Sequence, residues 1–306
     1  EKTIANILNL PNKIDQTNEI QSIYREIMSA ALALETDMKI SYLGPEATFT
    51  HQAARGKFGA SVKYVPAGTI SDVFYNVQNR SADYGVVPIE NSTEGAVTHT
   101  FDQFVKTPLK ICAEIYLPIS LMLLSNYELS NLKVIYSKQE VFGQCRNWIE
   151  KYVPQIELVA VESTTKAVTL AIKESNSAAI AGIAASDMYG IDVIAENIQD
   201  IHGNTTRFLV IGHNYGDSSG NDKTSLVLGV KHEAGALYRI LSVFKSGNIN
   251  LSKIESRPSR NQAWEYYFFV DLDGHVDDKS LIKVIENLKK ECITLTILGS
   301  YPKVKN

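Results

Sequence analysis

The sequence of 306 residues is poor in cysteine and has no long apolar run. Its three cysteines, Cys112, Cys145 and Cys292, are far apart and form no CxxC motif, which argues against a disulfide framework and against a zinc site. No two histidines have the HxxxH or HExxH spacing of a metal site, so we expect neither a metal nor a cofactor. The longest apolar stretches, such as residues 117–124, are far shorter than the ~18 to 20 residues that span a bilayer, and no signal peptide opens the chain. We therefore expect a cytoplasmic protein without a membrane partner.

Charge of one sign is not concentrated in the chain either. The 30 basic and 34 acidic residues give a formal net charge of −4, and no block of Lys or Arg stands out. This pattern argues against a nucleic-acid partner, which would need phosphate-neutralising cations, and favours a small-molecule ligand. The hydrophobic fraction of 44% is that of an ordinary folded protein with length enough for two cores.

Two breaks in the pattern predict the domains. Apolar residues recur at helical spacing between Ile20 and Leu34, and an alternating strand pattern begins at Lys39. Residues 212–222 are polar, glycine-bearing and aperiodic, as interdomain linkers are. We expect a helical appendage (1–37), a domain of two α/β lobes (38–213), a linker (214–223) and a C-terminal domain (224–302) with the βαββαβ order of a ferredoxin-like fold.

Polar residues follow four of the expected strands, where parallel sheets place ligands. Residues 42–51 leave a strand through Gly44-Pro45 and enter a helix whose first N–H groups suit an anion, although the threonines there also suit simple helix caps. Residues 86–95 carry Glu90, Asn91 and Ser92 directly after an apolar strand, which indicates either a hydrogen-bonding pocket or an ordinary surface turn.

The other two junctions carry a serine with a glutamine and a threonine with an arginine. Ser137 ends a strand, and Gln144 faces the same cleft if the next helix begins near residue 139; a surface-exposed glutamine is the alternative. Arg207 can receive a carboxylate bidentately or form a salt bridge to a neighbouring domain. In a regular strand Thr206 and Arg207 point to opposite faces, so they share a ligand only if the backbone is irregular there.

Together these segments resemble the prephenate dehydratase family over Ile40 to Gly299. The resemblance rests on YLGPEATFTHQAA (42–54), GVVPIENSTEGAV (85–97), the Ser137 and Gln144 pair and NTTRF (204–208). GAL (235–237) and ESRP (255–258) are similar to the signatures of the regulatory ACT domain that follows this enzyme, and residues 21–35 to the last helix of a fused chorismate mutase domain. The resemblance implies a two-lobed catalytic domain of the periplasmic-binding-protein type with a cleft between the lobes. Ala47 departs from the family, which usually has glycine there, and so do residues 138–140.

The resemblance also implies roles for the junction residues. Thr206 donates a proton or hydrogen bond to the leaving hydroxyl of prephenate, and Glu90 or a water held by Asn91 polarises it. Asn91, Ser137 and Gln144 are hydrogen-bonding groups, and Arg207 is a carboxylate partner or a support of the pocket. The remaining residues expected at the substrate are Thr48, Phe49, Ser92, Ser163, Thr164 and Phe208.

The expected regulator is phenylalanine, bound in the C-terminal domain. The residues expected at that site are Gly235, Ala236, Leu237, Asn250, Leu251, Glu255, Ser256, Arg257 and Pro258. We expect a homodimer or homotetramer formed through this domain. No chorismate mutase activity is expected, because residues 1–37 offer only Lys2, Lys13 and Arg25 as cations for a dianion. The competing hypothesis is a noncatalytic amino-acid-binding sensor, since two α/β lobes around a cleft also describe solute-binding proteins.

Overall fold

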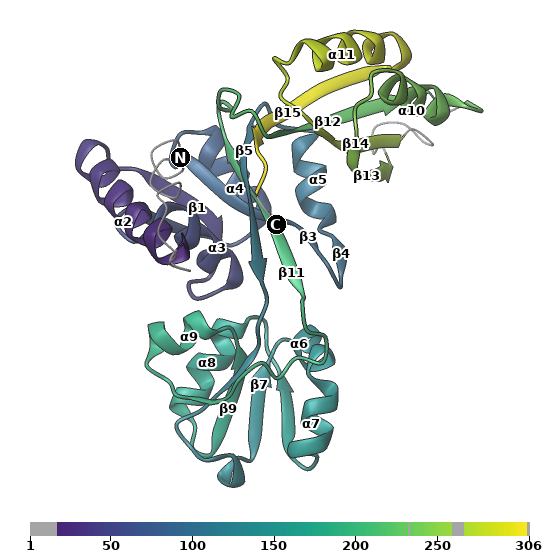
Figure 1. Cartoon of the computed structure of the whole chain (residues 1–306). Coiled ribbons are helices and arrows are strands. Elements are labelled where there is room, and N and C mark those ends of the chain that lie inside the picture. Colours follow the sequence, from purple (N-terminus) through teal and green to yellow (C-terminus); the bar gives the residue numbers. More distant parts are fainter. Residues whose placement is uncertain (1–16, 232, 259–265, 305–306) are drawn as a thin grey trace.

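The computed structural model describes residues 17–231, 233–258 and 266–304. Three sheets follow one another from the lower lobe to the C-terminal domain (Figure 1). We call the part with the first sheet lobe 1 (residues 39–118 and 205–212) and the part with the second sheet lobe 2 (residues 122–195). No helix in the described ranges has both the length and the apolarity needed to cross a membrane.

Lobe 1 is a mixed sheet with the strand order β2-β1-β3-β11-β5, and β4 pairs with β3. Its strands are β1 (Lys39–Leu43), β2 (Lys63–Ala67), β3 (Tyr84–Asn91), β4 (Gly95–Ala96), β5 (Lys110–Pro118) and β11 (Thr205–Gly212). Its helices are α3 (Phe49–Phe58), α4 (Ile70–Gln78) and α5 (Thr98–Phe104). Strand β11 follows lobe 2 in the chain and returns to the sheet of lobe 1. It lies between β3 and β5 and is antiparallel to both.

Lobe 2 is a second mixed sheet with the order β10-β6-β9-β7-β8. Its strands are β6 (Met122–Leu124), β7 (Val134–Ser137), β8 (Glu157–Ala160), β9 (Ser177–Ala181) and β10 (Val193–Ala195). Its helices are α6 (Gln139–Gln144), α7 (Arg146–Tyr152), α8 (Thr164–Lys173) and α9 (Ile183–Tyr189), with a short 3₁₀ turn η1 (Leu129–Asn131). Strand β9 is buried at every position, as a central strand covered on both faces must be.

The chain crosses between the lobes twice, after β5 and before β11, and the two crossings lie side by side (Figure 1). The backbone N–H of Ile119 donates to the carbonyl of Asn204 at 2.8 Å, which ties one crossing to the other. Two adjacent strands linking two α/β lobes is the hinge arrangement of periplasmic-binding-protein folds, so the predicted architecture is confirmed.

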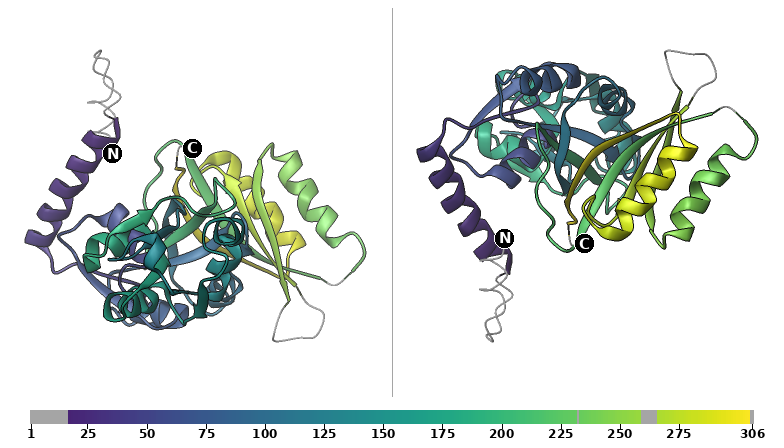
Figure 2. Two further views of the ribbon diagram at one scale, coloured as in Figure 1. Left: turned by 90° about the horizontal axis from the view of Figure 1, so that it is seen from below. Right: turned by 90° about the horizontal axis from the view of Figure 1, so that it is seen from above.

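The C-terminal domain is a four-stranded antiparallel sheet with the order β13-β14-β12-β15. Its elements are β12 (Asp222–Val230), α10 (Ala236–Ser246), β13 (Leu251–Pro258), β14 (Tyr266–Asp273), α11 (Lys279–Glu291) and β15 (Thr294–Pro302), in the predicted βαββαβ order. Both helices cover one face of the sheet, as the view from above shows (Figure 2).

The other face of this sheet packs on lobe 1. Phe101, Phe104 and Ile111 of lobe 1 share one buried cluster with Phe269 and Leu298 of the C-terminal domain. The backbones also meet: a Cβ added at Gly299 of β15 lies 2.1 Å from the carbonyl oxygen of Ile111 in β5. The residues between β11 and β12 therefore connect two domains that share a core.

Helix α2 (Thr17–Glu35) precedes lobe 1. Its Glu26 carboxylate accepts from the backbone N–H of Ala60 at 2.8 Å, and its Ser29 hydroxyl accepts from that of Ser61 at 3.1 Å. Ile27 and Leu34 of the predicted apolar stripe are 55% and 90% exposed. The helix thus docks on lobe 1 through polar groups and leaves much of its apolar stripe exposed.

Candidate active site

Strands β3 and β11 bring the two strongest candidates together. Thr206 lies opposite Asn91 in the antiparallel pairing of these strands. The Asn91 side-chain amide donates to the Thr206 hydroxyl oxygen at 2.8 Å, and Thr206 is 9% exposed. Residues 115 positions apart in the chain thus form one hydroxyl–amide pair, at the end of lobe 1 that faces lobe 2.

The orientation of the Asn91 amide follows from its other partners. Its carbonyl oxygen accepts from the Thr93 backbone N–H at 2.9 Å, from the Thr93 hydroxyl at 2.6 Å and from the Glu94 N–H at 3.0 Å. Three donors at the oxygen leave the NH₂ group to face Thr206. Because Thr206 accepts this hydrogen bond, its own proton remains available for donation to another oxygen.

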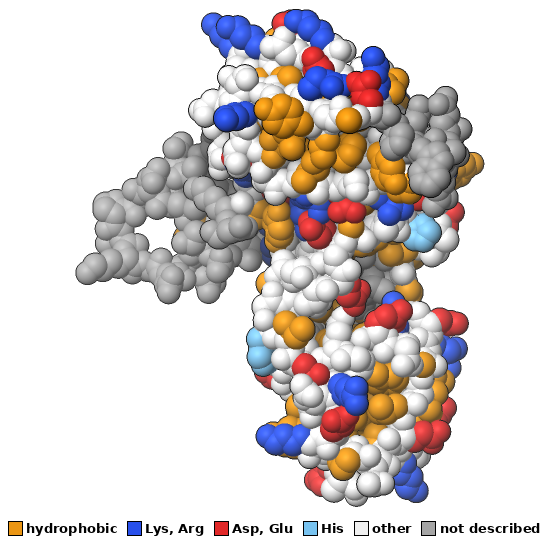
Figure 3. Space-filling model, turned by 90° about the vertical axis from the view of Figure 1, so that its right-hand side faces the viewer, with side chains coloured by type: hydrophobic (Ala, Val, Ile, Leu, Met, Phe, Trp, Pro, Cys, Tyr) orange, Lys and Arg blue, Asp and Glu red, His pale blue; other side chains and the backbone are white. Residues whose placement is uncertain are grey.

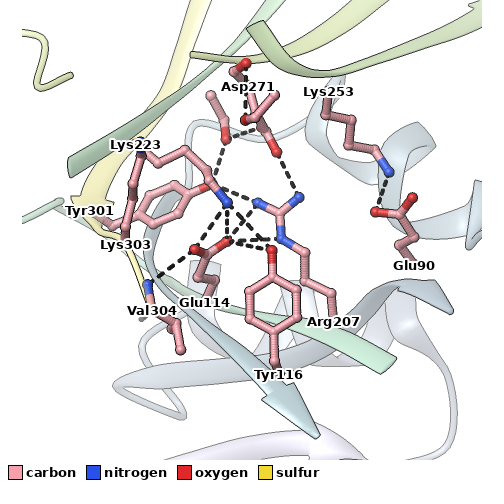
Figure 4. A network of polar contacts seen from close by, with 12 residues as sticks. Glu90, Glu114, Tyr116, Arg207, Lys223, Lys253, Asp271, Tyr301, Lys303 and Val304 are labelled. Carbon is pink, nitrogen blue, oxygen red and sulfur yellow. Dashed lines mark hydrogen bonds and ion pairs between the residues drawn. The ribbon is translucent and has the colours of Figure 1, made fainter. Parts of the chain in front are cut away.

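Glu90 and Arg207 lie on the opposite face of the same two strands, which corrects their predicted roles. They are paired across the strands, one position away from Asn91 and Thr206, so the alternation of a regular strand turns them away from the cleft. The Glu90 carboxylate lies 2.5 Å from the Lys253 ammonium of the C-terminal domain (Figure 4). It is therefore Asn91, directly, and not Glu90, that contacts the Thr206 hydroxyl.

Arg207 is bound within a buried network between the domains and does not contact the cleft. Its guanidinium donates to Glu114 at 2.9 Å, to Asp271 at 2.6 Å and to the Tyr301 hydroxyl at 3.0 Å (Figure 4). Burial lowers the pKa of this guanidinium, but Tyr301, Asp271 and Glu114 outweigh it and raise the pKa above its ordinary value. Of the two alternatives for Arg207, the structure selects the salt bridge to the neighbouring domain.

Gln144 reaches the hydroxyl–amide pair from lobe 2 through Glu94. Its side-chain amide donates to the Glu94 carboxylate at 2.5 Å. The Glu94 backbone N–H in turn donates to Asn91. A continuous set of polar groups, Thr206, Asn91, Glu94 and Gln144, therefore crosses from lobe 1 to lobe 2. Figure 3 shows the molecule narrowed between the two lobes, with acidic side chains beside the narrowing.

Ser137 and Ser92 make bonds within the protein. Ser137 is fully buried, and its hydroxyl donates to the carbonyl of Ile180 at 2.7 Å, so its proton is not offered to a substrate. The Ser92 hydroxyl donates to Asn204 at 3.3 Å and accepts from the Thr205 N–H at 2.9 Å. Ser92 therefore holds the end of β3 against the start of β11, where Thr206 lies.

The turn before α3 is built around Ala47 and His51. Ala47 has a φ of 61°, a left-handed conformation that favours glycine, so the departure from the family pattern falls where a side chain is disfavoured. Its N–H donates to the Nδ1 of His51 at 3.1 Å, and the His51 ring stacks on Tyr42. Thr48 accepts from the His51 N–H at 3.3 Å as the N-cap of α3, which is the capping role that the spacing also suggested.

This turn contacts lobe 2. The Thr165 hydroxyl donates to the carbonyl of Glu46 at 2.6 Å. Phe49 packs against lobe 2 at Gly182, where an added Cβ lies 2.8 Å from the ring. Phe49 is thus a contact between the lobes. Sequence reasoning did not single out Glu94, His51 or Thr165 for a role, although Glu94 and His51 lie inside the quoted segments 85–97 and 42–54.

Three further predicted substrate residues have structural positions. Ser163 is the N-cap of α8 and accepts from the Lys166 N–H at 3.0 Å. Thr164 begins α8 and is 9% exposed. Phe208 is 2% exposed and packs in a core with Ile40 and Tyr42, so it offers a substrate no accessible surface in this arrangement. Among the described residues, no group of three His, Cys, Asp or Glu is placed to hold a metal.

The C-terminal domain has a pocket at the start of α10. A cavity of about 160 Å³ is lined by Val230, Lys231, Glu233, Ala236, Leu237, Tyr266 and Phe268. Gly235, with a φ of 81°, is the N-cap of α10, a conformation that this residue adopts without strain. The GAL segment therefore lies beside aromatic and charged side chains, as a site for an amino acid with an apolar side chain requires.

The residues 255–258 are divided between the two faces of the sheet. Ser256 and Pro258 are opposite Phe268 and Tyr266 of the pocket, whereas Glu255 and Arg257 alternate with them and share the side of Lys253. Arg257 lies 3.4 Å from Asp102 of α5 in lobe 1. Asn250 bonds Asp273 at 3.2 Å, and Leu251 packs against the helix-side core. Within one copy of the chain, Glu255 and Arg257 therefore face lobe 1 rather than the pocket.

A hydroxyl–amide pair between two hinged α/β lobes, joined to a ferredoxin-like domain with its own pocket, is the architecture of a small-molecule enzyme or sensor with a second ligand-binding domain. The family model "Prephenate dehydratase" matches residues 40–215, and the model "ACT domain" matches residues 224–290. The chain belongs to the prephenate dehydratase family, and the predicted resemblance is confirmed. Membership in this family supports the hypothesis of an enzyme over that of a noncatalytic amino-acid-binding sensor.

Relatives and solved structures agree with this assignment. A bifunctional chorismate mutase/prephenate dehydratase of Aquifex aeolicus is 49% identical over 282 residues, which cover 92% of this chain and 78% of that one. A prephenate dehydratase of Lactococcus lactis is 36% identical over 86% of this chain and 97% of its own length. The structure of a prephenate dehydratase from Arthrobacter aurescens in complex with L-Phe has 32% identity and a TM-score of 0.80 over 87% of this chain and 90% of that one.

Proposed function

We propose that the chain converts prephenate to phenylpyruvate, with Thr206 as the group that donates a proton to the leaving hydroxyl. The reaction breaks the bond from a ring carbon to its carboxylate and the bond from the opposite ring carbon to its hydroxyl. Carbon dioxide and water leave, the water taking up one proton, and the ring becomes aromatic. Because aromatisation supplies the driving force, the main task of the enzyme is to help hydroxide leave as water.

The observation that carries this proposal is the bond from the Asn91 amide to Thr206. An unperturbed threonine hydroxyl is a very weak acid. A donor at its oxygen stabilises negative charge that develops there, and it leaves the hydroxyl proton directed elsewhere. Groups of this kind typically contribute ~10² to 10⁴ in rate as general acids.

The second requirement is to hold two carboxylates while one loses its charge. We assign Gln144 as a neutral donor to a carboxylate, because it approaches the Thr206 and Asn91 pair from the facing lobe. A neutral donor binds the departing carboxylate without opposing the loss of its charge. Closure of the lobes excludes water from that group, which favours decarboxylation.

For regulation we propose that phenylalanine binds the pocket lined by Ala236 and Leu237, which follow Gly235, with Tyr266 and Phe268 beside its ring. Self-association to a dimer or tetramer through residues 224–300 accompanies this, since β13 is an edge strand with Ile254 46% exposed. Sedimentation velocity of the full chain tests the assembly. We also propose a cytoplasmic location, because all three cysteines are free thiols, as a reducing compartment keeps them.

The experiment is the ultraviolet absorbance of phenylpyruvate after prephenate is added. Thr206→Val keeps the size of the side chain and removes the hydroxyl, so we expect kcat to fall by ~10² to 10⁴. Thr206→Ser keeps the hydroxyl and serves as the matched control, with most of the activity retained. A folded Thr206→Val variant with the turnover of the unchanged protein contradicts the assignment.

A further inference from the structure

The C-terminal domain contacts strands β3 and β11 on the face opposite the hydroxyl–amide pair. Glu90 and Arg207 face each other across β3 and β11. Lys253 and Asp271 face each other in the same way across β13 and β14. Two ion pairs join these cross-strand pairs, Glu90 to Lys253 at 2.5 Å and Arg207 to Asp271 at 2.6 Å. We call these four residues the charge quartet (Figure 4).

The quartet is buried enough for its geometry to matter. The side chains of Lys253, Arg207 and Asp271 are 13%, 6% and 10% exposed, whereas that of Glu90 is 40% exposed, so the Arg207–Asp271 pair is the more shielded of the two. Lys253 also lies over the ring of Phe101, 5.7 Å from its centroid. Charge pairs shielded from water are screened weakly, so a change in their spacing changes the free energy more than it would at the surface.

One end of the quartet is adjacent in the chain to the Asn91 and Thr206 pair, and the other end lies on the strands that line the pocket beside α10. Glu90 and Arg207 are the chain neighbours of Asn91 and Thr206, whose mutual bond orients the hydroxyl proton. Asp271 lies on β14, which also supplies Tyr266 and Phe268 to the pocket beside α10. Lys253 lies on β13, whose last residue Pro258 is paired with Tyr266.

We propose that Lys253 is a positioning residue for the Asn91 and Thr206 pair, and that the charge quartet transmits phenylalanine binding from the C-terminal domain to it. The proposal rests on the proposed function and names how that site is regulated. A ligand that shifts β13 and β14 moves Lys253 and Asp271, and with them the ion-paired Glu90 and Arg207. Because Asn91 and Thr206 are the adjacent residues on the same strands, their positions change as well. A differential contact of this kind is what coupling between two sites requires.

The test compares inhibition with binding in Lys253→Met, which removes the ammonium and keeps the aliphatic chain. We expect the phenylalanine concentration for half-inhibition to rise at least about tenfold, while its Kd by titration calorimetry changes less than about threefold. Lys253→Arg keeps the charge and should retain inhibition. The unfolding temperature is recorded for each variant, because a merely structural role of Lys253 alters stability without separating binding from inhibition.

Asp102→Asn is the matched control, because Asp102 pairs with Arg257 of the same strand β13 but lies on α5 and not on β3 or β11. We expect this variant to keep both turnover and inhibition. Equal loss of inhibition in Asp102→Asn and Lys253→Met contradicts the proposal, because any loosened contact between the domains would then suffice.

Two other outcomes overturn it. One is a Lys253→Met variant that binds phenylalanine and is inhibited as the unchanged protein is; the other is loss of inhibition that follows from loss of phenylalanine binding. If Lys253→Met does not fold, Glu90→Gln breaks the same ion pair from lobe 1 and is judged by the same two measurements. The unchanged protein is assayed first, and failure to convert prephenate refutes the proposed function itself. If the unchanged protein converts prephenate and is inhibited by phenylalanine, but Lys253→Met is inhibited to the same extent, only the proposed role of the charge quartet is refuted.

Discussion

Lobe 1 has two neighbours, and the two boundaries differ in chemistry. Towards the C-terminal domain it shares a buried aromatic and aliphatic core and encloses the Arg207 network. Towards lobe 2 it offers two strand crossings, the packing of Phe49 and individual hydrogen bonds such as those of Gln144 and Thr165. A shared core resists relative movement, whereas crossings with a few polar contacts behave as a hinge. Lobe 1 and the C-terminal domain thus share one core, and lobe 2 is joined to them through the hinge strands.

The largest effect on this comparison is expected from Arg207→Met. The substitution leaves the buried Asp271 carboxylate with the Ser225 hydroxyl, and Glu114 with Lys223, Tyr116 and the Val304 N–H. Removing one member of a buried ion pair destabilises by about 3 kcal/mol or more. Thermal unfolding measures this loss, and the control Arg146→Met, which removes the exposed pair with Glu150, should leave the unfolding temperature nearly unchanged. Equal shifts in the two variants would show that the boundary does not depend on its ions.

Gly299→Ala tests the packing of the same boundary without touching a charge. The added methyl group meets the backbone of Ile111, so β15 must move away from β5. Overpacking of this kind costs about 1 to 3 kcal/mol, measured by chemical denaturation. Gly216→Ala, in the segment between the domains, has nothing within 4 Å of its new methyl group and should be nearly neutral. An unchanged denaturation midpoint for Gly299→Ala would mean that close packing of β15 on β5 does not stabilise the boundary between lobe 1 and the C-terminal domain.

Thr165→Val tests the boundary between the lobes, where we expect a smaller loss. The bond from Thr165 to the Glu46 carbonyl contributes about 0.5 to 1.5 kcal/mol, as a single neutral hydrogen bond does. Because the bond joins the lobes, we expect KM for prephenate to rise, while the unfolding temperature falls only slightly. Thr169→Val is the matched control, since its hydroxyl bonds the Thr165 carbonyl within α8. A larger stability loss than in Arg207→Met would reverse the comparison.

The smallest effect is expected from the titration of His51. Burial, followed by the charge of Arg55, lowers the pKa of His51. The unfolded chain therefore binds a proton near the ordinary histidine pKa of about 6.5 before the folded chain does, so stability falls as the pH drops through this value and levels off below the folded pKa. His51→Gln lacks this contribution, and unfolding temperatures between about pH 8 and pH 5 should fall less steeply for it. Parallel curves for the two proteins would contradict the assignment.

Much of the fold could be predicted from patterning. The strand alternation after residue 39, the βαββαβ order of the tail and the polar segments after the strands all have local causes, and the structure has the corresponding elements. Motif resemblance also brought Asn91 and Thr206 into one site, although they are 115 residues apart. The absence of mutase activity and the domain boundaries stay predictions.

The sequence identified side chains that form hydrogen bonds and ion pairs, but it did not identify the groups to which they bind. Arg207 was open to two interpretations, because a guanidinium binds a substrate carboxylate and an aspartate by the same geometry. Ser137 and Thr48 carry the hydroxyls expected of binding residues, yet they bond Ile180 and the backbone around α3. Local sequence shows which groups are available for hydrogen bonding, but not which acceptor is closest once the chain has folded.

The sequence by itself determined the chemistry available to this protein: hydroxyls and amides after the strands, a period of two along β3, β11 and β13, and an apolar pattern sufficient for three sheets. Only the tertiary structure decided which face of each strand meets a substrate and which meets another domain. A period of two sorts neighbouring residues onto opposite faces without saying what lies beyond either face. That depends on the packing of lobe 2 and the regulatory domain around lobe 1, which arises from contacts between segments far apart in the chain.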